Sequence, residues 1–460
     1  MEIGVIQKGW KGRTHIGIVY PNDYYIGMSN LAIHALYDLI NADETIVAER
    51  IFLDSNGSIE SKRRLHEFDL ILFSFSFETD YLNIPALLRG ETPLLRKERS
   101  KTPVLMAGGA AVTLNPYALS EIFDCIAVGE AECMIEEIKA AAREGSRDDI
   151  LRRLAQHPSI IVPDIKEGYK ERAWVRDIDT IPISTVIWSE KTEFGHMHLV
   201  EASRGCPFRC RFCATPCIYS PYRARGREAL EKAIARGLKV RRQIGIIGSD
   251  ILRHGEYIEL ASSLAREGIG VSFSSIRVDG ITRETAHLIA ECGQNRIALG
   301  IEAGREEMRY KIGKRISNEK ILEAVRNLAE EGITRLKLYF MIGLPEEDEE
   351  DIAEIARLSA TIREWVLKYR RSSEMVPEIS VVATPFVPKK GTPLEDAPFC
   401  SMSTLKKKLS FLRHLVAKIG GVTISGEAPK KAYLEYLLSN GRPDEIVKIL
   451  EKGGYEKDAS

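Results

Sequence analysis

Along the chain, short apolar runs of strand length alternate with longer segments that have the apolar period of a helix. This alternation occurs in two long blocks. In the first block, four near-continuous apolar runs predict strands, at residues 15–21, 68–76, 102–109 and 124–130. Such runs are typical of parallel strands that are covered on both faces. Residues 29–42 have the period of a helix, with Ser29 as a candidate N-cap. The pattern predicts an α/β domain with a doubly wound, Rossmann-like sheet over residues 1–145.

A second block of alternation follows a less regular connector at residues 146–190, in which we expect a helix at 147–155. The block predicts six strands, at residues 198–203, 243–249, 270–275, 296–302, 334–341 and 377–384. It also predicts helices, near residues 226–238, 256–267, 282–292, 318–331 and 349–368. Repeated strand–helix units favour a partial parallel (β/α)6 barrel over residues 191–395. Residues 396–460 are expected to form a small C-terminal helical region.

The predicted strands of the first domain end in small or polar residues. Ligands of open α/β sheets bind at the carboxyl ends of the strands. We therefore expect a nucleotide or cofactor site at these ends, formed by Ser74, Ser76, Gly108, Gly109, Gly129 and Glu130.

The composition adds few constraints. Hydrophobic residues make up 44%, charged residues 28%, and the formal net charge is −1, which is ordinary for a globular protein. This balance creates no overall positive field that would attract nucleic acid, so we expect no nucleic-acid partner.

Apolar runs are shorter than a membrane span, and residues 1–13 lack the apolar region of a signal peptide. We expect a cytoplasmic protein with no membrane partner. Basic residues cluster between 223 and 242, where a solvated helix face is favoured over a site for an acidic partner.

Half of the eight cysteines lie between residues 206 and 217. Cys206, Cys210 and Cys213 form a C-x3-C-x2-C run, and Cys217 follows four residues later. Structural zinc sites mostly use two separated C-x2-C pairs. The other four cysteines are scattered, so zinc is the less favoured alternative. Three clustered thiolates fit a [4Fe–4S] cluster that keeps one iron open. The loop follows the first barrel strand, where barrel enzymes carry their chemistry.

With Phe212 directly before the third cysteine, this loop resembles the motif of the radical S-adenosylmethionine (SAM) superfamily. The resemblance implies that Cys206, Cys210 and Cys213 are the metal ligands and the catalytic centre. It implies that the open iron binds SAM, and that an electron from the cluster cleaves SAM to a 5′-deoxyadenosyl radical. That radical abstracts a hydrogen atom from an unreactive position. An electron donor such as ferredoxin or flavodoxin is the implied partner, and Cys217 is expected to be a neighbour of the cluster.

Other strand ends resemble the positions that hold SAM in this superfamily. Asp250, with Gly248 and Ser249, stands where the superfamily usually has Gly-Gly-Glu and binds the amino group of SAM. Glu302 resembles the glutamate that contacts the ribose. The other expected positions face the barrel mouth or pack on adenine, namely Ser275, Arg277, Ile342 and Gly343.

The order of an α/β domain, a connector and a barrel resembles the cobalamin-binding class of the superfamily. The resemblance implies that cobalamin binds at the six strand-end residues of the first domain. It also implies a C-methyltransferase, in which a substrate radical takes a methyl group from methylcobalamin. One branch of the class methylates residues of a protein such as methyl-coenzyme M reductase, and we favour a protein or peptide acceptor.

The first domain departs from the class at one loop. Residues 23–27 read DYYIG, whereas many cobalamin domains have Asp-x-His-x-x-Gly, with a histidine that ligates cobalt. His34 lies inside a predicted helix and is not well placed to replace it. Either cobalamin binds with its lower face free or blocked by a side chain such as Tyr24, Phe77 or Glu78, or the domain has lost the cofactor.

Two further hypotheses stay open. One is a radical SAM enzyme of another reaction type, such as rearrangement or coupling, with a cofactor-free first domain. The other is a non-enzymatic iron–sulfur protein that carries electrons or acts as a sensor. Thiolation is disfavoured because it usually needs a second cluster, and the remaining cysteines form no second three-cysteine motif.

Overall fold

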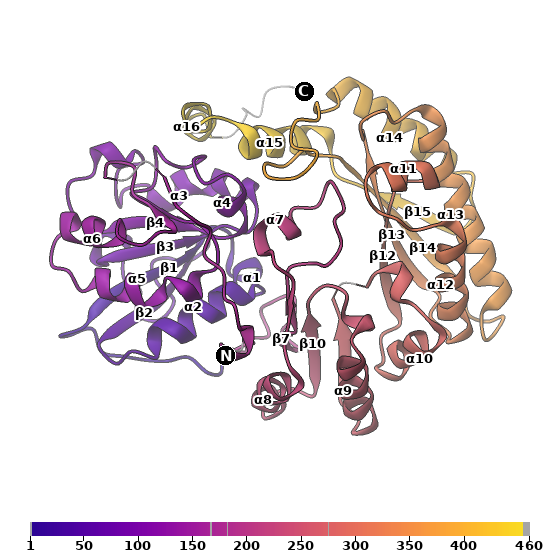
Figure 1. Ribbon diagram of the computed structural model, residues 1–460, viewed down its shortest axis with the longest axis horizontal. Coiled ribbons are helices and arrows are strands. Elements are labelled where there is room, and N and C mark those ends of the chain that lie inside the picture. The colour runs from indigo at the N-terminus through magenta and orange to yellow at the C-terminus, as the bar shows by residue number, and fades with distance from the viewer. Residues whose placement is uncertain (1, 166–167, 182, 275, 454–460) are drawn as a thin grey trace. The chain divides into compact units, whose positions relative to one another are not determined.

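The computed structural model describes residues 2–165, 168–181, 183–274 and 276–453 (Figure 1). The chain divides into two compact units, Met1–Leu199 with Leu437–Ser460, and Val200–Tyr436. The C-terminal helix α16 (Pro443–Glu451) contacts α3 (Ile84–Leu88) within the first unit. The segment predicted as one C-terminal region therefore contributes to both units.

A six-stranded sheet of order β2-β1-β3-β4-β5-β6 forms the centre of the first unit (Figure 1). The pairs among the first five strands are parallel, and β6 pairs antiparallel with β5. These pairings confirm the predicted doubly wound α/β fold. The strands are β1 (Thr14–Tyr20), β2 (Ile46–Phe52), β3 (Leu70–Ser74), β4 (Val104–Gly108), β5 (Cys125–Ala127) and β6 (Ile160–Ile161).

The hydrophobic pattern did not predict β2, because Glu49 and Arg50 interrupt its apolar run. Both side chains are buried in the structure. Arg50 forms ion pairs with Glu2 and Glu60, each at 2.7 Å, and Glu49 accepts a hydrogen bond of 2.6 Å from Trp10 Nε1. Buried charges are tolerated where they are paired and hydrogen-bonded. The partners of Glu49 and Arg50 therefore allow β2 to lie in the buried sheet.

Short helices connect the strands of the first unit. Helix α2 begins after Asn30, whose side chain accepts a hydrogen bond of 2.9 Å from the backbone N–H of Ala32. The predicted cap, Ser29, is wrong, because its hydroxyl donates to the carbonyl of Tyr25 at 2.6 Å. Besides α3 and α16, the helices are α1 (Tyr24–Gly27), α2 (Leu31–Asn41), α4 (Ala110–Leu114), α5 (Ile135–Ala142) and α6 (Arg147–Leu154).

The second unit contains the sheets β11-β10-β7 and β12-β13-β14-β15. All six predicted barrel strands are present, which confirms the partial parallel barrel. A seventh strand, β15, pairs parallel with β14 in a region that we expected to be helical. It was missed because this edge strand, VTIS, contains only two apolar residues, Val422 and Ile424, and so gives no continuous apolar run. The strands are β7 (His198–Glu201), β10 (Gln243–Ile247), β11 (Gly270–Phe273), β12 (Arg296–Glu302), β13 (Arg335–Ile342), β14 (Glu378–Pro385) and β15 (Val422–Ser425).

Helices cover one face of the larger of these sheets. Along β13, alternate residues such as Leu338 and Phe340 belong to a core cluster shared with the helices. Successive side chains of a strand point to opposite faces, so Lys337, Tyr339 and Met341 face the concave side of the sheet. The helices of this unit are α7 (Thr215–Tyr219), α8 (Arg227–Leu238), α9 (Gly255–Arg266), α10 (Arg283–Glu291), α11 (Glu306–Lys311), α12 (Asn318–Glu330), α13 (Glu349–Tyr369), α14 (Met402–Val416) and α15 (Pro429–Asn440).

No helix in the part of the chain that the structure describes is long and apolar enough to cross a membrane.

Candidate functional site

The cysteine loop begins directly after β8 (Ser203–Arg204), next to the end of the first barrel strand. All three motif cysteines are free thiols, with Cys210 buried and Cys206 and Cys213 partly exposed. Gly205 has φ +81°, and a Cβ there would lie 2.5 Å from the carbonyl oxygen of Tyr219. The tight turn into the loop therefore requires glycine.

Backbone contacts fix the loop against the segment that follows α11. The N–H of Arg211 donates to the carbonyl of Ile312 at 2.9 Å. A Cβ at Gly313 would lie 2.9 Å from the carbonyl oxygen of Arg209. Elements that follow the first and fourth barrel strands thus hold the cysteines in place.

Cationic side chains surround the loop. The guanidinium of Arg277 lies over the ring of Phe208, 3.5 Å from its centroid, and that of Arg253 lies 5.1 Å from the same centroid. Burial raises the pKa of the Cys210 thiol, while the charges of Lys314 and Arg277 act to lower it. Positive neighbours stabilise thiolates, which are the form that ligates metals.

The described residues include no group of three or more His, Cys, Asp or Glu side chains arranged to hold a metal ion. Whether an iron–sulfur cluster can bind here is therefore judged from the available donor atoms, the cysteine sulfurs. Three thiols on one anchored loop, beside Arg277 and Lys314, match a cluster with three thiolate ligands. The ligand role of the three cysteines remains a prediction.

Cys217 makes contacts of its own. Its thiol donates to the carbonyl of Gly391 at 3.0 Å and lies 3.9 Å from the carbonyl oxygen of Cys213. Burial raises the pKa of this thiol. These contacts account for a neutral thiol beside the loop, in agreement with its expected place as a neighbour.

Left-handed backbone conformations gather at the barrel strand ends. Asp250, Glu302 and Glu346 have φ of 58°, 74° and 63°, and Lys62 is the remaining described non-glycine residue with a positive φ. Asp250 follows β10, Glu302 ends β12, and Glu346 follows β13. Residues held in such conformations cluster at functional sites, so the backbone supports the predicted roles of Asp250 and Glu302.

Ser249 and Asp250 lie against the start of the cysteine loop. The hydroxyl of Ser249 donates to the carbonyl of Gly205, and its N–H donates to Ser203 Oγ at 3.0 Å. Asp250 lies 3.3 Å from Arg253, and burial raises the pKa of its carboxyl. Two segments predicted to share one site are therefore in direct contact.

The other predicted mouth residues are already paired within the protein. Arg277 forms an ion pair of 3.0 Å with Asp279, and Glu302 forms one of 3.2 Å with Lys314. A carboxylate-bearing ligand of Arg277 would thus share the guanidinium with Asp279. Ser275 lies outside the described residues.

The predicted adenine-packing residues are Ile342 and Gly343. The Cβ position of each faces the covering helices and not the concave side of the sheet. Ile342 is fully buried in the core cluster of the covering helices. A Cβ at Gly343 would lie 2.7 Å from the side chain of Leu405. Any contact of these residues with adenine would be made by the backbone. Sequence reasoning missed Lys337, Tyr339 and Met341, although the period of two along β13 distinguishes them.

The predicted cofactor edge of the first unit is held by a close approach of two loops. Ser74 is buried at the end of β3, and Ser76 Oγ accepts a hydrogen bond of 2.7 Å from Asn30 Nδ2. Gly108, at the end of β4, accepts a hydrogen bond of 2.9 Å from Phe75 N–H. Gly109 has φ +108°, and a Cβ there would lie 2.4 Å from the carbonyl oxygen of Phe75.

Gly129 and Glu130 contact the connector. A Cβ at Gly129 would lie 2.2 Å from the carbonyl oxygen of Ala173, and Glu130 Oε2 accepts a hydrogen bond of 2.9 Å from Val175 N–H. These contacts explain both residues without a ligand. Their predicted cofactor role is therefore the least supported of the six strand-end positions.

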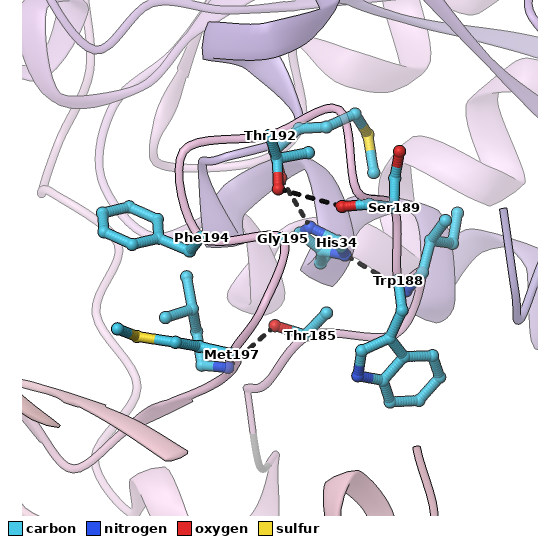
Figure 2. A pocket seen from close by; sticks show the side chains of 11 residues that line it. His34, Thr185, Trp188, Ser189, Thr192, Phe194, Gly195 and Met197 are labelled. Atoms are coloured by element: carbon cyan, nitrogen blue, oxygen red, sulfur yellow. Dashed lines mark hydrogen bonds between the residues drawn. The ribbon is translucent and has the colours of Figure 1, made fainter. Parts of the chain in front are cut away.

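His34 lies beside a small pocket of the first unit (Figure 2). Its Nδ1 accepts a hydrogen bond of 3.2 Å from Val186 N–H, and its Nε2 lies 3.1 Å from the carbonyl oxygen of Met28. Burial lowers the pKa of His34 to about 4. Both ring nitrogens of the neutral imidazole are engaged, so His34 is not a metal ligand. The pocket is lined by Met28, His34, Thr185, Ile187, Trp188, Ser189, Thr192, Phe194, Gly195, Met197 and Leu199.

Two family models match the chain. The model of the radical SAM superfamily matches residues 200–359, and the model of the N-terminal part of radical SAM proteins matches residues 32–163. The uncharacterized protein MJ0966 of Methanocaldococcus jannaschii is 29% identical, over 88% of this chain and 84% of the relative. The hopanoid C-3 methylase of Methylococcus capsulatus is 24% identical, over 76% of this chain and 64% of that protein.

The fold also matches a solved structure over almost its whole length. TsrM from Kitasatospora setae is a radical SAM methyltransferase whose structure contains cobalamin and a [4Fe–4S] cluster. The match covers 96% of this chain and 99% of TsrM, with a TM-score of 0.62 and 16% identity.

The chain is a radical SAM protein. It belongs to the radical SAM superfamily and is an enzyme, for which a [4Fe–4S] cluster and SAM are the cofactors that this membership implies.

Proposed function

We propose that this enzyme is a cobalamin-dependent radical SAM C-methyltransferase. The observation that carries the proposal is the match to TsrM, because a match over 96% of the chain extends over both units. A methylase is also among the relatives. The exposed apolar side chains at the sheet edge of the first unit, Tyr25, Ile26 and Phe77, suit a large ring.

Each unit has its own task in this proposal. When bound, the cluster with SAM supplies a hydrogen-abstracting radical, and cobalamin supplies a methyl group. Cys206, Cys210 and Cys213 hold the cluster. The carboxylates of Asp250 and Glu302 accept hydrogen bonds from the amino group and ribose of SAM, which orients the bond that breaks.

The proposed methyl acceptor is an unactivated carbon of a protein or peptide residue, for example in methyl-coenzyme M reductase. Support comes from the concave face of the larger barrel sheet, where Ala298 and Thr423 are exposed. An open face of this kind suits an acceptor presented on a large molecule. A ferredoxin or flavodoxin is the proposed electron donor.

The test of methyl transfer has two parts. Protein purified anaerobically with supplied cobalamin should show stoichiometric corrinoid absorption, and its absence after reconstitution would refute the proposal. Peptide mass spectrometry of cells with and without the protein should then reveal one peptide that lacks a methyl group. A changed lipid or metabolite beside unchanged peptides would overturn the protein acceptor and leave methyl transfer intact.

A second candidate is a radical SAM enzyme of another reaction type with a cofactor-free first unit. The contacts of Gly129 and Glu130 with the connector favour this candidate, because connector residues lie where the loop was predicted to contact a cofactor. SAM cleavage without bound corrinoid would support this candidate.

A further inference from the structure

Exposed apolar side chains lie on the loops that follow two neighbouring strands of the first unit, β1 and β3. Strand β1 lies between β2 and β3, so the strand order reverses at the pair β1 and β3. Ligands of doubly wound sheets bind at the carboxyl ends of the strands at such a switch point. Tyr25 and Ile26 follow β1, and Phe77 follows β3, with exposed fractions of 45%, 42% and 63%.

Neighbouring contacts hold Phe77 outward. Phe75, two residues earlier, is fully buried and packs edge-on against Tyr81, with ring centroids 5.0 Å apart. Phe75 N–H donates to the carbonyl of Gly108 at 2.9 Å, and the carbonyl of Phe77 accepts from Asp80 N–H at 3.2 Å. The backbone is thus fixed on both sides of Ser76, and Phe77 projects from the edge because Phe75 points into the core.

Two other side chains on these loops, Tyr24 and Glu78, are less available to a ligand at the sheet edge. Tyr24 donates to Glu2 Oε1 at 2.6 Å and packs edge-on against Phe52, and Glu78 is only 5% exposed. The loops after β1, β3 and β4, residues 21–30, 75–83 and 109–117, contain no histidine. Of the three candidates, Phe77 is the one that projects.

We propose that Phe77 covers the lower face of the cobalt in bound cobalamin and keeps this face without a nitrogen ligand. The inference rests on the proposed function, because it requires that the first unit binds cobalamin. A phenyl ring has no lone pair to donate to a metal, and it packs favourably on an apolar ring. Together with Tyr25 and Ile26, it excludes both water and the lower base of the cofactor from the cobalt.

Electron paramagnetic resonance (EPR) of the reduced, paramagnetic cob(II)alamin form reads the lower ligand directly. A coordinated nitrogen splits each cobalt line into three, and an unligated lower face shows no such splitting. Protein reconstituted with hydroxocobalamin, freed of excess cofactor and reduced should show a spectrum without nitrogen splitting. Splitting in the native protein would overturn the inference while leaving cobalamin binding established.

Substitutions at the same position sharpen the test. Phe77→His should introduce the threefold nitrogen splitting, because it places an imidazole where the ring lies. Phe77→Leu should keep the native spectrum, since it stays apolar. Leu53→His is the matched control, because Leu53 follows the neighbouring strand β2 and is 37% exposed. An unchanged Phe77→His spectrum, or splitting in Leu53→His alone, would place the cobalt elsewhere and overturn the inference.

A variant that removes the ring without adding a ligand tests whether Phe77 covers the cobalt. Phe77→Ala is such a variant, and the EPR spectrum of its cob(II)alamin form should change from the native spectrum to that of cobalt with water at the lower face. An identical spectrum in Phe77→Ala would overturn the inference. If the native protein retains no corrinoid, the proposed function fails, and the inference fails with it.

Discussion

The carboxyl ends of the parallel strands present different kinds of side chains in the two units. In the first unit, Tyr25, Ile26 and Phe77 are exposed on the loops after β1 and β3, and the Tyr25 hydroxyl donates a hydrogen bond to Glu193. At the edge of the second unit, Asp250 and Glu302 lie in left-handed backbone conformations, each beside a cationic side chain. Parallel strands thus end in apolar loops that suit a large ring in the first unit, and in charged loops that suit a small zwitterion in the second. The difference lies in the loops, not in the strands.

The largest expected effect is the loss of all radical chemistry on replacing one cysteine. Cys210→Ala removes the buried thiol of the loop, and three ligands are the minimum for a cluster with one open iron. We expect no cluster absorption and no detectable SAM cleavage. Both are measured on anaerobically reconstituted protein.

Cys217→Ala is the matched control, because Cys217 bonds to the carbonyl of Gly391. It should keep full iron content and SAM cleavage. Loss of the cluster in Cys217→Ala would make Cys217 a fourth ligand, and a cluster with four thiolate ligands has no open iron for SAM.

The second effect is on the binding of SAM and concerns the charged loops of the second unit. Glu302→Gln and Asp250→Asn remove one carboxylate each while keeping the shape of the side chain. Charge-assisted hydrogen bonds contribute more than neutral ones. We expect the Kd of SAM to rise about tenfold for each variant, equivalent to about 1.4 kcal/mol. Isothermal titration of SAM into cluster-loaded protein measures this, and unchanged Kd values would remove these residues from the site.

A third effect tests whether the first unit uses Gly129 for structure. Gly129→Ala places a Cβ 2.2 Å from the carbonyl oxygen of Ala173 at φ +110°, so we expect a loss of about 2–3 kcal/mol in the free energy of unfolding. Gly145→Ala is the control, since nothing lies within 4 Å of its Cβ position. Urea unfolding compares the two variants. Equal stability would show that the connector yields easily at this point.

The last effect is on the pH dependence of stability and concerns Asp80, three residues after Phe77. Burial raises the pKa of Asp80 from 3.8 to about 6. The native state therefore binds the proton more tightly than the unfolded state, and stability falls as the pH rises from about 4 to about 6. We expect Asp80→Asn to remove about 1–2 kcal/mol of this decline. Urea unfolding of both proteins at pH 4.5 and pH 8, as chosen conditions on either side of about 6, measures it, and parallel pH profiles would contradict the assignment.

Most of the fold followed from the hydrophobic pattern, because parallel strands covered on both faces leave a strong signal. The exceptions have specific causes. Strand β2 was hidden by Glu49 and Arg50, whose partners come from distant segments. Strand β15 is an edge strand with only two apolar residues, so it gives no continuous apolar run. The N-cap of α2 was off by one residue, because Ser29 and Asn30 are both good capping residues and only the backbone geometry selects between them.

The candidate site was less completely predictable. The spacing of the cysteines and the polar strand ends identified candidate loops, yet a strand end in the sequence does not reveal where its side chain points. Ile342 faces the covering helices, and Glu130 binds the connector. Both outcomes depend on packing against residues that are far away in the sequence.

The sequence alone determined the two α/β units, the order of their elements and the cysteine loop, because these depend on local periodicity and spacing. The tertiary structure decided which strand-end residues face a ligand and which are bound by the protein. It set the left-handed conformations of Asp250 and Glu302, and it turned Phe75 inward and Phe77 outward. Contacts between distant segments decide such orientations, because a buried partner stabilises one direction of a side chain over the other.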